Sequence, residues 1–136
     1  MIQRIQSVWL FVAAAVTFLT LKLSFYSGTL PTNTQYHQLN GTDTILLMST
    51  TIVLGVLSLI NIFLFKKRKI QLRLTILAIV LELLLIFLFY RETTKFVQGE
   101  YAITAALHVI IILSLFFASR GINADEKLIR NSDRLR

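Results

Sequence analysis

The strongest constraint on the fold is a pair of apolar runs, 45–65 and 72–90, joined by a short basic segment. Each run is long enough to cross about 30 Å of hydrocarbon as a helix, since a helix rises about 1.5 Å per residue. Two further apolar runs, 8–25 and 101–118, lie on either side of this pair. The sequence therefore predicts four membrane-spanning helices.

The composition agrees with a membrane protein and excludes several other classes. Hydrophobic residues make up 55% of the chain and the mean hydropathy is +0.70, well above a soluble domain. The net charge of +7 would suit nucleic acid in a soluble chain, but the basic residues flank apolar runs instead of forming a polar face. The sequence contains no cysteine and two histidines, too few for a metal cage. We expect no nucleic acid, metal or cofactor.

The basic segment 66–71, with Arg73 just after it, predicts the orientation in the membrane. Lys and Arg beside spans are retained on the cytoplasmic side. If the spans alternate outward from this segment, 11 of the 14 basic residues lie on its side. The other three, Lys22, Arg91 and Lys95, lie opposite. We therefore expect a multi-pass protein with both termini in the cytoplasm.

The first apolar run has the basic start of a secretory signal peptide as well as that of a span. Ala13, Ala14 and Ala15 lie inside the run, however, and no small-residue cleavage site follows it cleanly. An uncleaved span is the favoured interpretation. Its far end is followed by the polar segment 27–43, which has no Lys or Arg and is predicted to be an extracytoplasmic loop.

The short connections between the later spans predict how the helices pack. Consecutive helices joined by short loops are antiparallel neighbours. The predicted fold class is therefore an all-α membrane protein, an antiparallel four-helix transmembrane bundle with a short C-terminal amphipathic helix. Small and weakly polar residues recur at helical spacing in every run, as expected for the packed faces of such a bundle. These residues are Ala13, Thr17, Thr20 and Ser24 in the first run, Met48, Thr51, Gly55, Ser58 and Asn61 in the second, Thr75, Ala78 and Glu82 in the third, and Tyr101, Thr104, Ala105 and His108 in the fourth.

Glu82 is the residue in these runs that most needs a partner. It lies near the middle of its span, where an acidic side chain costs about 2.5–3.5 kcal/mol. His108 falls at the same predicted depth in the fourth span, so we expect a hydrogen bond between them, direct or through one water. Thr17 and Gly55 are predicted to complete this polar layer, with Gly55 allowing close approach. Whether the pair is neutral or ionic stays open, as does its role as a proton site or as a link between helices.

The segment 121–136 is predicted to form a short amphipathic helix in the cytoplasm. Gly121 would end the fourth span and Asn123 would cap the new helix. Lys127, Arg130 and Arg134 surround a narrow apolar side. Such a helix can lie on the membrane surface or dock a partner, and the alternative is a solvated end.

Three short motifs carry a resemblance to a known family. They are MIQRIQ at 1–6, KIQLRL at 69–74 and DEKLIRNSDRLR at 125–136. In this order they resemble a family of small four-span bacterial inner-membrane proteins catalogued as a domain of unknown function. The resemblance covers the whole length and implies the topology and a bacterial inner membrane, but no activity.

Two functions remain as hypotheses. The first is a non-enzymatic accessory or scaffold subunit whose basic cytoplasmic face binds anionic lipid headgroups or a larger membrane complex. The second is a small proton- or ion-coupled transporter subunit that uses Glu82. A membrane enzyme is disfavoured because the interface offers no nucleophile, metal cluster or acid–base pair. The residues expected to contact lipid or a partner are Lys66, Lys67, Arg68, Lys69, Arg73, Lys127, Arg130 and Arg134.

Overall fold

The computed structural model describes residues 2–31 and 33–135. Within them lie four α-helices, a three-residue 3-10 helix and three strands. The helices are α1 (Ile2–Leu19), α2 (Ile45–Phe63), α3 (Arg68–Thr93), η1 (Ile103–Ala105) and α4 (Ala106–Arg134). The strands are β1 (Ser24–Leu30), β2 (Asn33–Asn40) and β3 (Gln98–Tyr101), and they form an antiparallel sheet in the order β2-β1-β3.

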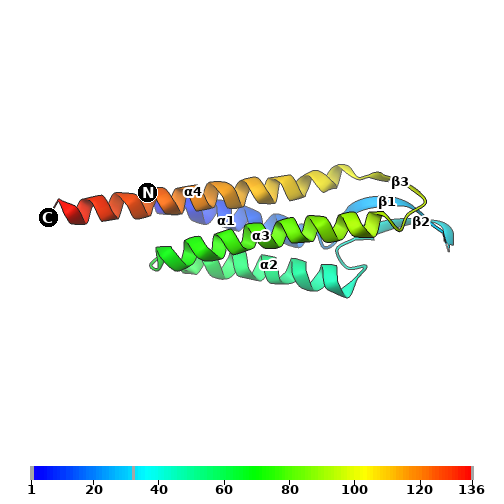
Figure 1. Ribbon diagram of the computed structural model, residues 1–136, viewed down its shortest axis with the longest axis horizontal. Helices are drawn as coiled ribbons and strands as arrows, with labels where there is room; N and C mark the ends of the chain where they lie inside the picture. The colour runs from blue at the N-terminus through cyan, green and yellow to red at the C-terminus, as the bar shows by residue number, and fades with distance from the viewer. Residues whose placement is uncertain (1, 32, 136) are drawn as a thin grey trace.

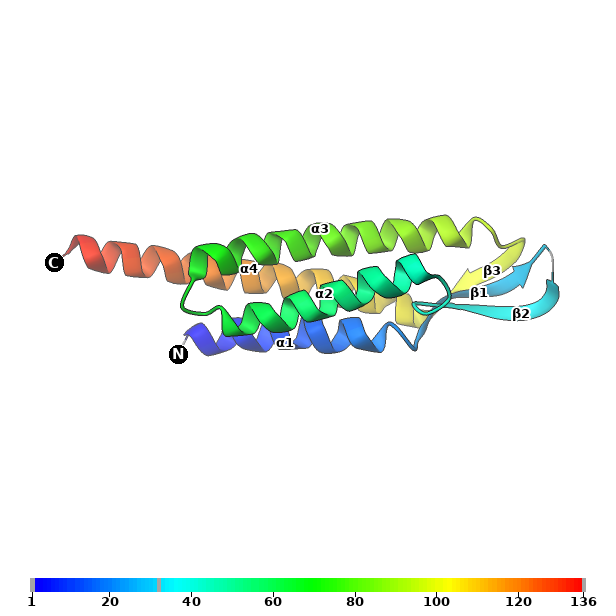
Figure 2. The same cartoon turned by 90° about the horizontal axis from the view of Figure 1, so that it is seen from below.

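The four α-helices form one elongated bundle with the sheet at one end (Figure 1). Helix α1 packs against α2 and α4, and α3 packs against the same two helices. We call the end with the strands the sheet end. The opposite end, where the α2–α3 loop lies and α4 extends furthest, is called the basic end (Figure 2). Helices α2, α3 and α4 are long and apolar enough to cross a membrane, whereas the apolar part of α1 is the shorter Ile5–Leu19.

The sheet corrects two predictions, the all-α fold class and the first span at 8–25. Helix α1 ends at Leu19, and the chain turns into β1 before Phe25. The segment of β1 contains Phe25, Tyr26 and Thr29, whose residue types favour strands, and strands on both sides pair with its backbone. The apolar run 8–25 does not show by itself that its last residues pair with other strands. The predicted loop 27–43 is consequently mostly a hairpin of β1 and β2.

Most of the other element boundaries differ from the predicted ones, although α2 begins at Ile45 as predicted. Tyr101, predicted to start the fourth span, lies in β3, and α4 begins at Ala106. Helix α3 extends beyond the predicted 72–90 in both directions, so the basic segment 66–71 is largely helical. Thr104 belongs to the predicted stripe of the fourth run, and Arg4 is one of the 11 basic residues counted on the side of the basic segment. The side chains of both residues lie outside the described part of the structure.

The predicted break at Gly121 is wrong, because α4 runs without interruption from the bundle into the tail. Gly121 permits a close helix contact there. A Cβ built on it would lie 2.9 Å from Cγ of Gln6 in α1, and the Gln6 amide donates to the Gly121 carbonyl at 2.8 Å. Asn123 therefore lies within the helix and caps nothing. The predicted helicity of the tail is confirmed.

The interior of the bundle contains many polar side chains, while large apolar side chains lie on its outside. Large apolar residues such as Ile60, Leu84 and Phe87 are exposed on the outside of the bundle. Buried hydroxyl groups donate mainly to carbonyls one turn back in their own helix, as Thr51 does to Leu47 at 2.7 Å. Gly55 lies under the ring of Phe18, which confirms that it allows close packing.

Candidate functional site

The predicted contact between Glu82 and His108 is confirmed. Glu82 Oε1 lies 2.6 Å from Nδ1 of His108, a direct hydrogen bond between α3 and α4. Glu82 is 0% exposed and His108 3%. Helical spacing places Glu82 on the same buried face of α3 as Thr75 and Ala78. Each side chain therefore supplies the partner that the other needs inside the bundle.

Two phenylalanine rings pack against this pair. The ring centroids of Phe25 and Phe89 lie 5.3 Å and 5.2 Å from the imidazole of His108, and the two phenyl rings stack on one another at 4.6 Å. Phe89 is two turns beyond Glu82 in α3, and Phe25 belongs to β1. An apolar plug thus separates the pair from the sheet end.

The other two members of the predicted polar layer do not bond to the pair. The Thr17 hydroxyl donates to the carbonyl of Ala13 in its own helix at 2.6 Å. Gly55 contributes space for Phe18 instead of a polar group. Both residues are buried, but the structure joins only Glu82 and His108 of the four.

A second buried polar cluster lies nearer the basic end. The side-chain amide of Asn61 donates to the Thr75 hydroxyl at 2.7 Å, and the side-chain amide of Gln71 donates to the main-chain carbonyl of Asn61 at 3.1 Å. All three side chains are nearly or completely buried. Asn61 and Thr75 stood out in the sequence as small or polar residues on packed faces. The burial of Gln71 was not predicted, because Gln71 lies in the basic segment. Only its position seven residues before Ala78, which places both residues on one face of a helix, could have indicated it.

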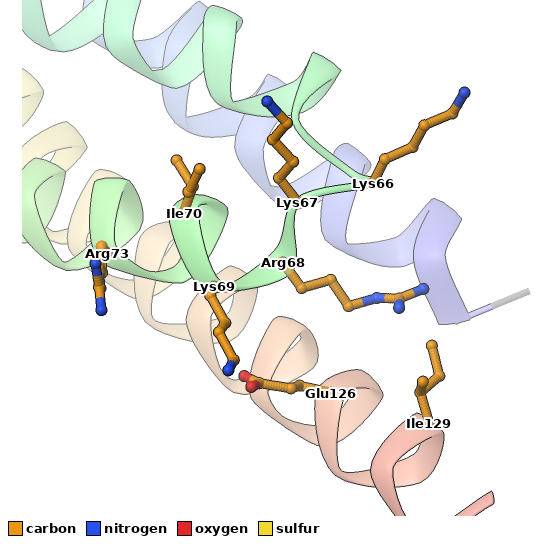
Figure 3. Close-up of a pocket in the computed structure, with 8 residues that line it drawn as sticks. All are labelled: Lys66, Lys67, Arg68, Lys69, Ile70, Arg73, Glu126 and Ile129. Atoms are coloured by element: carbon orange, nitrogen blue, oxygen red, sulfur yellow. The ribbon is translucent and has the colours of Figure 1, made fainter. Parts of the chain in front are cut away.

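The predicted basic residues divide into two groups. Those of the α2–α3 loop and the start of α3 line a groove of about 530 Å³, together with residues of α4 (Figure 3). The lining residues are Lys66, Lys67, Arg68, Lys69, Ile70, Arg73, Glu126 and Ile129. The tail residues Lys127, Arg130 and Arg134 are exposed on the extension of α4 and do not line it.

One ion pair joins the two sides of this groove. Arg68 Nε donates to Asp125 Oδ2 at 3.1 Å, and both side chains are largely shielded from solvent. Figure 3 shows Lys69 and Glu126 pointing toward one another, whereas Lys66 and Lys67 point away from the tail. The acidic start of the tail therefore holds α4 against α3.

Comparison with known proteins places the chain in a family. A family model described as domain of unknown function (DUF4293) matches residues 2–135. The chain belongs to this family. No curated protein and no solved structure matched it. The predicted resemblance to a domain-of-unknown-function family is thereby confirmed, and three long apolar helices are consistent with a membrane protein.

The chemistry open to this DUF4293 protein follows from its two polar regions. Its described residues contain no group of three or more His, Cys, Asp or Glu side chains placed to hold a metal ion. The Glu82–His108 pair joins a carboxyl group and an imidazole by a direct hydrogen bond. The basic groove can bind an anion beside an apolar surface that includes Ile70 and Ile129.

Proposed function

We propose that this DUF4293 protein is a four-span accessory or scaffold subunit of the bacterial cytoplasmic membrane that binds anionic lipid headgroups at its basic end. The basic end faces the cytoplasm in this proposal. The extension of α4 then offers Lys127, Arg130 and Arg134 to a larger membrane complex.

The basic groove carries the proposal. Five Lys and Arg side chains and two isoleucines line it at the end of an apolar bundle. Of the five, Arg68 is paired with Asp125 and orders the groove. Lipid phosphates lie at the level where membrane helices emerge, and each nearby Lys or Arg adds about 1 kcal/mol of attraction to an anionic leaflet.

The orientation is tested with single cysteines, because the chain has none of its own. We expect Gln38→Cys in β2 and Asn131→Cys in α4 to react with an impermeant thiol reagent from opposite sides of the membrane. In intact bacterial cells, only Gln38→Cys should be labelled from outside. Labelling of both variants from one side would contradict the four-span arrangement.

Neutralising the two loop lysines together with Lys69, at the start of α3, should weaken binding of anionic lipid. We expect Lys66→Gln/Lys67→Gln/Lys69→Gln to bind phosphatidylglycerol about 100-fold more weakly, since about 1 kcal/mol is lost for each of the three charges and about 1.4 kcal/mol corresponds to a tenfold change in affinity. Binding is measured on the full chain in detergent by native mass spectrometry, with phosphatidylcholine for comparison.

The matched control removes the same charge from the sheet end. Lys22→Gln/Arg91→Gln/Lys95→Gln should bind phosphatidylglycerol within about twofold of the unchanged chain, because those residues lie outside the groove. An equal loss in both triple variants would show that net charge alone attracts the lipid. Unchanged binding in the loop variant would reject the groove as a lipid site and leave a protein partner as its occupant.

A further inference from the structure

We propose that Glu82 and His108 form a proton-binding site inside the bundle, and that protons reach it from the basic end only. This inference shares the membrane-spanning bundle with the proposed function but does not depend on lipid binding. Three observations carry it: the pair itself, the plug on one side and the polar cluster on the other.

The pair retains unused hydrogen-bonding capacity. Glu82 Oε1 is bonded to His108 Nδ1, but Glu82 Oε2 is buried and has no hydrogen-bond partner among the described residues. A carboxyl and an imidazole in contact can share one proton, take up another and release it again. Two coupled titratable groups in an apolar bundle are what reversible proton binding requires.

The path toward the sheet end is apolar and closed. Leu85 and Phe89 follow Glu82 on the buried face of α3, and both are 0% exposed. The Phe25 ring stacks on Phe89, and the Tyr101 ring packs edge-on against Phe25. The side chains of Leu85, Phe89 and Phe25 carry no group that can hydrogen-bond to water. Protons from the sheet end would have to cross this plug.

Toward the basic end, Ile111 and Leu115 follow His108 on the buried face of α4, and polar side chains begin about two helical turns from Glu82. Ala78, Thr75 and Gln71 follow Glu82 on the same face of α3, and Asn61 of α2 bonds to Thr75. The side-chain oxygens of Asn61 and Gln71 are buried and lack hydrogen-bond partners among the described residues. Buried acceptors of this kind are normally satisfied by internal water. Water at these oxygens would bring protons within about two helical turns of Glu82, since Thr75 is seven residues away.

No other ionisable side chain in the described interior competes with the pair. The buried polar side chains of α1 and α2 are amides and hydroxyls, such as Gln6, Thr17 and Ser58. Asp125 of α4 is buried but paired with Arg68 at the basic end. Tyr101 lies behind Phe25. A proton arriving from water at the basic end therefore binds at Glu82 or His108 and returns the same way.

Proton binding is tested by infrared spectroscopy on the full chain in liposomes. As the pH is varied, we expect a protonated-carboxyl band whose intensity changes with pH. The band should be lost in Glu82→Gln and should shift its midpoint in His108→Gln. A pH-independent spectrum, or the same band in Glu82→Gln, would overturn the proposal. Glu82→Gln should keep its lipid binding, so the two proposals fail by separate measurements.

The direction of access is tested with two cysteines on one face of α3. Ala78 lies on the basic side of Glu82 and Leu85 on the sheet side, and both are almost fully buried. We expect Ala78→Cys to react with a small water-soluble thiol reagent about tenfold faster than Leu85→Cys, since thiol reactivity follows solvent access. Equal rates, or a faster reaction at Leu85→Cys, would overturn access from the basic end.

Discussion

Replacing Glu82 with leucine should destabilise the bundle by about 3–5 kcal/mol, the usual cost of removing one member of a buried pair. His108 would then be left inside the bundle without its 2.6 Å hydrogen bond to α3. The measurement is the free energy of unfolding of the full chain in detergent micelles. Leu83→Ala, on the exposed face next to Glu82, serves as the control and should change stability far less.

A double-mutant cycle separates the pairing from the packing. Glu82→Leu/His108→Leu should be less destabilised than the sum of the two single variants, with a coupling of about 1–3 kcal/mol. The reason is that the double variant leaves neither polar group unpaired in the interior. Additive effects would mean that the contact contributes nothing specific to stability.

The Glu82–His108 contact could be predicted from sequence because it depends on depth. A helix rises by a fixed distance per residue, so the position of each residue along its span gives its level in the membrane. The third-span stripe was likewise correct, since Thr75, Ala78 and Glu82 are all buried. An otherwise apolar helix makes its few small or polar residues easy to recognise as the packed face.

Other assignments failed where a local pattern has more than one explanation. Ser24 continued the stripe of the first run, but it belongs to β1 because strands from elsewhere in the chain pair with that segment. Met48 was assigned to a packed face and is 36% exposed. Gly121 was expected to end a helix because glycine is common just after helix C-termini. The sequence does not show that Gln6 of α1 packs against it.

The basic end shows the limit of sequence reasoning for the candidate site. The cluster of Lys and Arg was evident, but the pairing of Arg68 with Asp125 joins residues 57 positions apart. Such a contact depends on how far α3 and α4 are shifted along one another. The helical spacing of residues within one helix does not predict that shift. The same holds for Asn61 and Gln71, whose contact depends on how the α2–α3 loop closes.

The sheet end depends on a close approach at Gly28, and a side chain there should detach β3. Gly28 pairs with Gly99, and a Cβ built on Gly28 would overlap the carbonyl oxygen of Gln98 and lie 2.6 Å from the Gly99 Cα. These are backbone atoms, so no rotamer change relieves the clash and the strands must separate. We expect Gly28→Val to destabilise the sheet end by about 3 kcal/mol or more, the upper range for overpacking.

Engineered disulfides can report the separation of the strands directly. Ser27 faces Glu100 across β1 and β3, and it faces Gln38 across β1 and β2. Directly opposed residues are close enough for a disulfide, so Ser27→Cys/Glu100→Cys should cross-link in the unchanged background. Adding Gly28→Val should abolish that cross-link while Ser27→Cys/Gln38→Cys still forms one, and Thr29→Val should preserve both. Because Tyr26 and Tyr101 pair in the same register and Phe25 covers the Glu82–His108 pair, loss of β3 should also expose His108 to solvent. A cross-link that survives Gly28→Val would show that β3 is not held at this register.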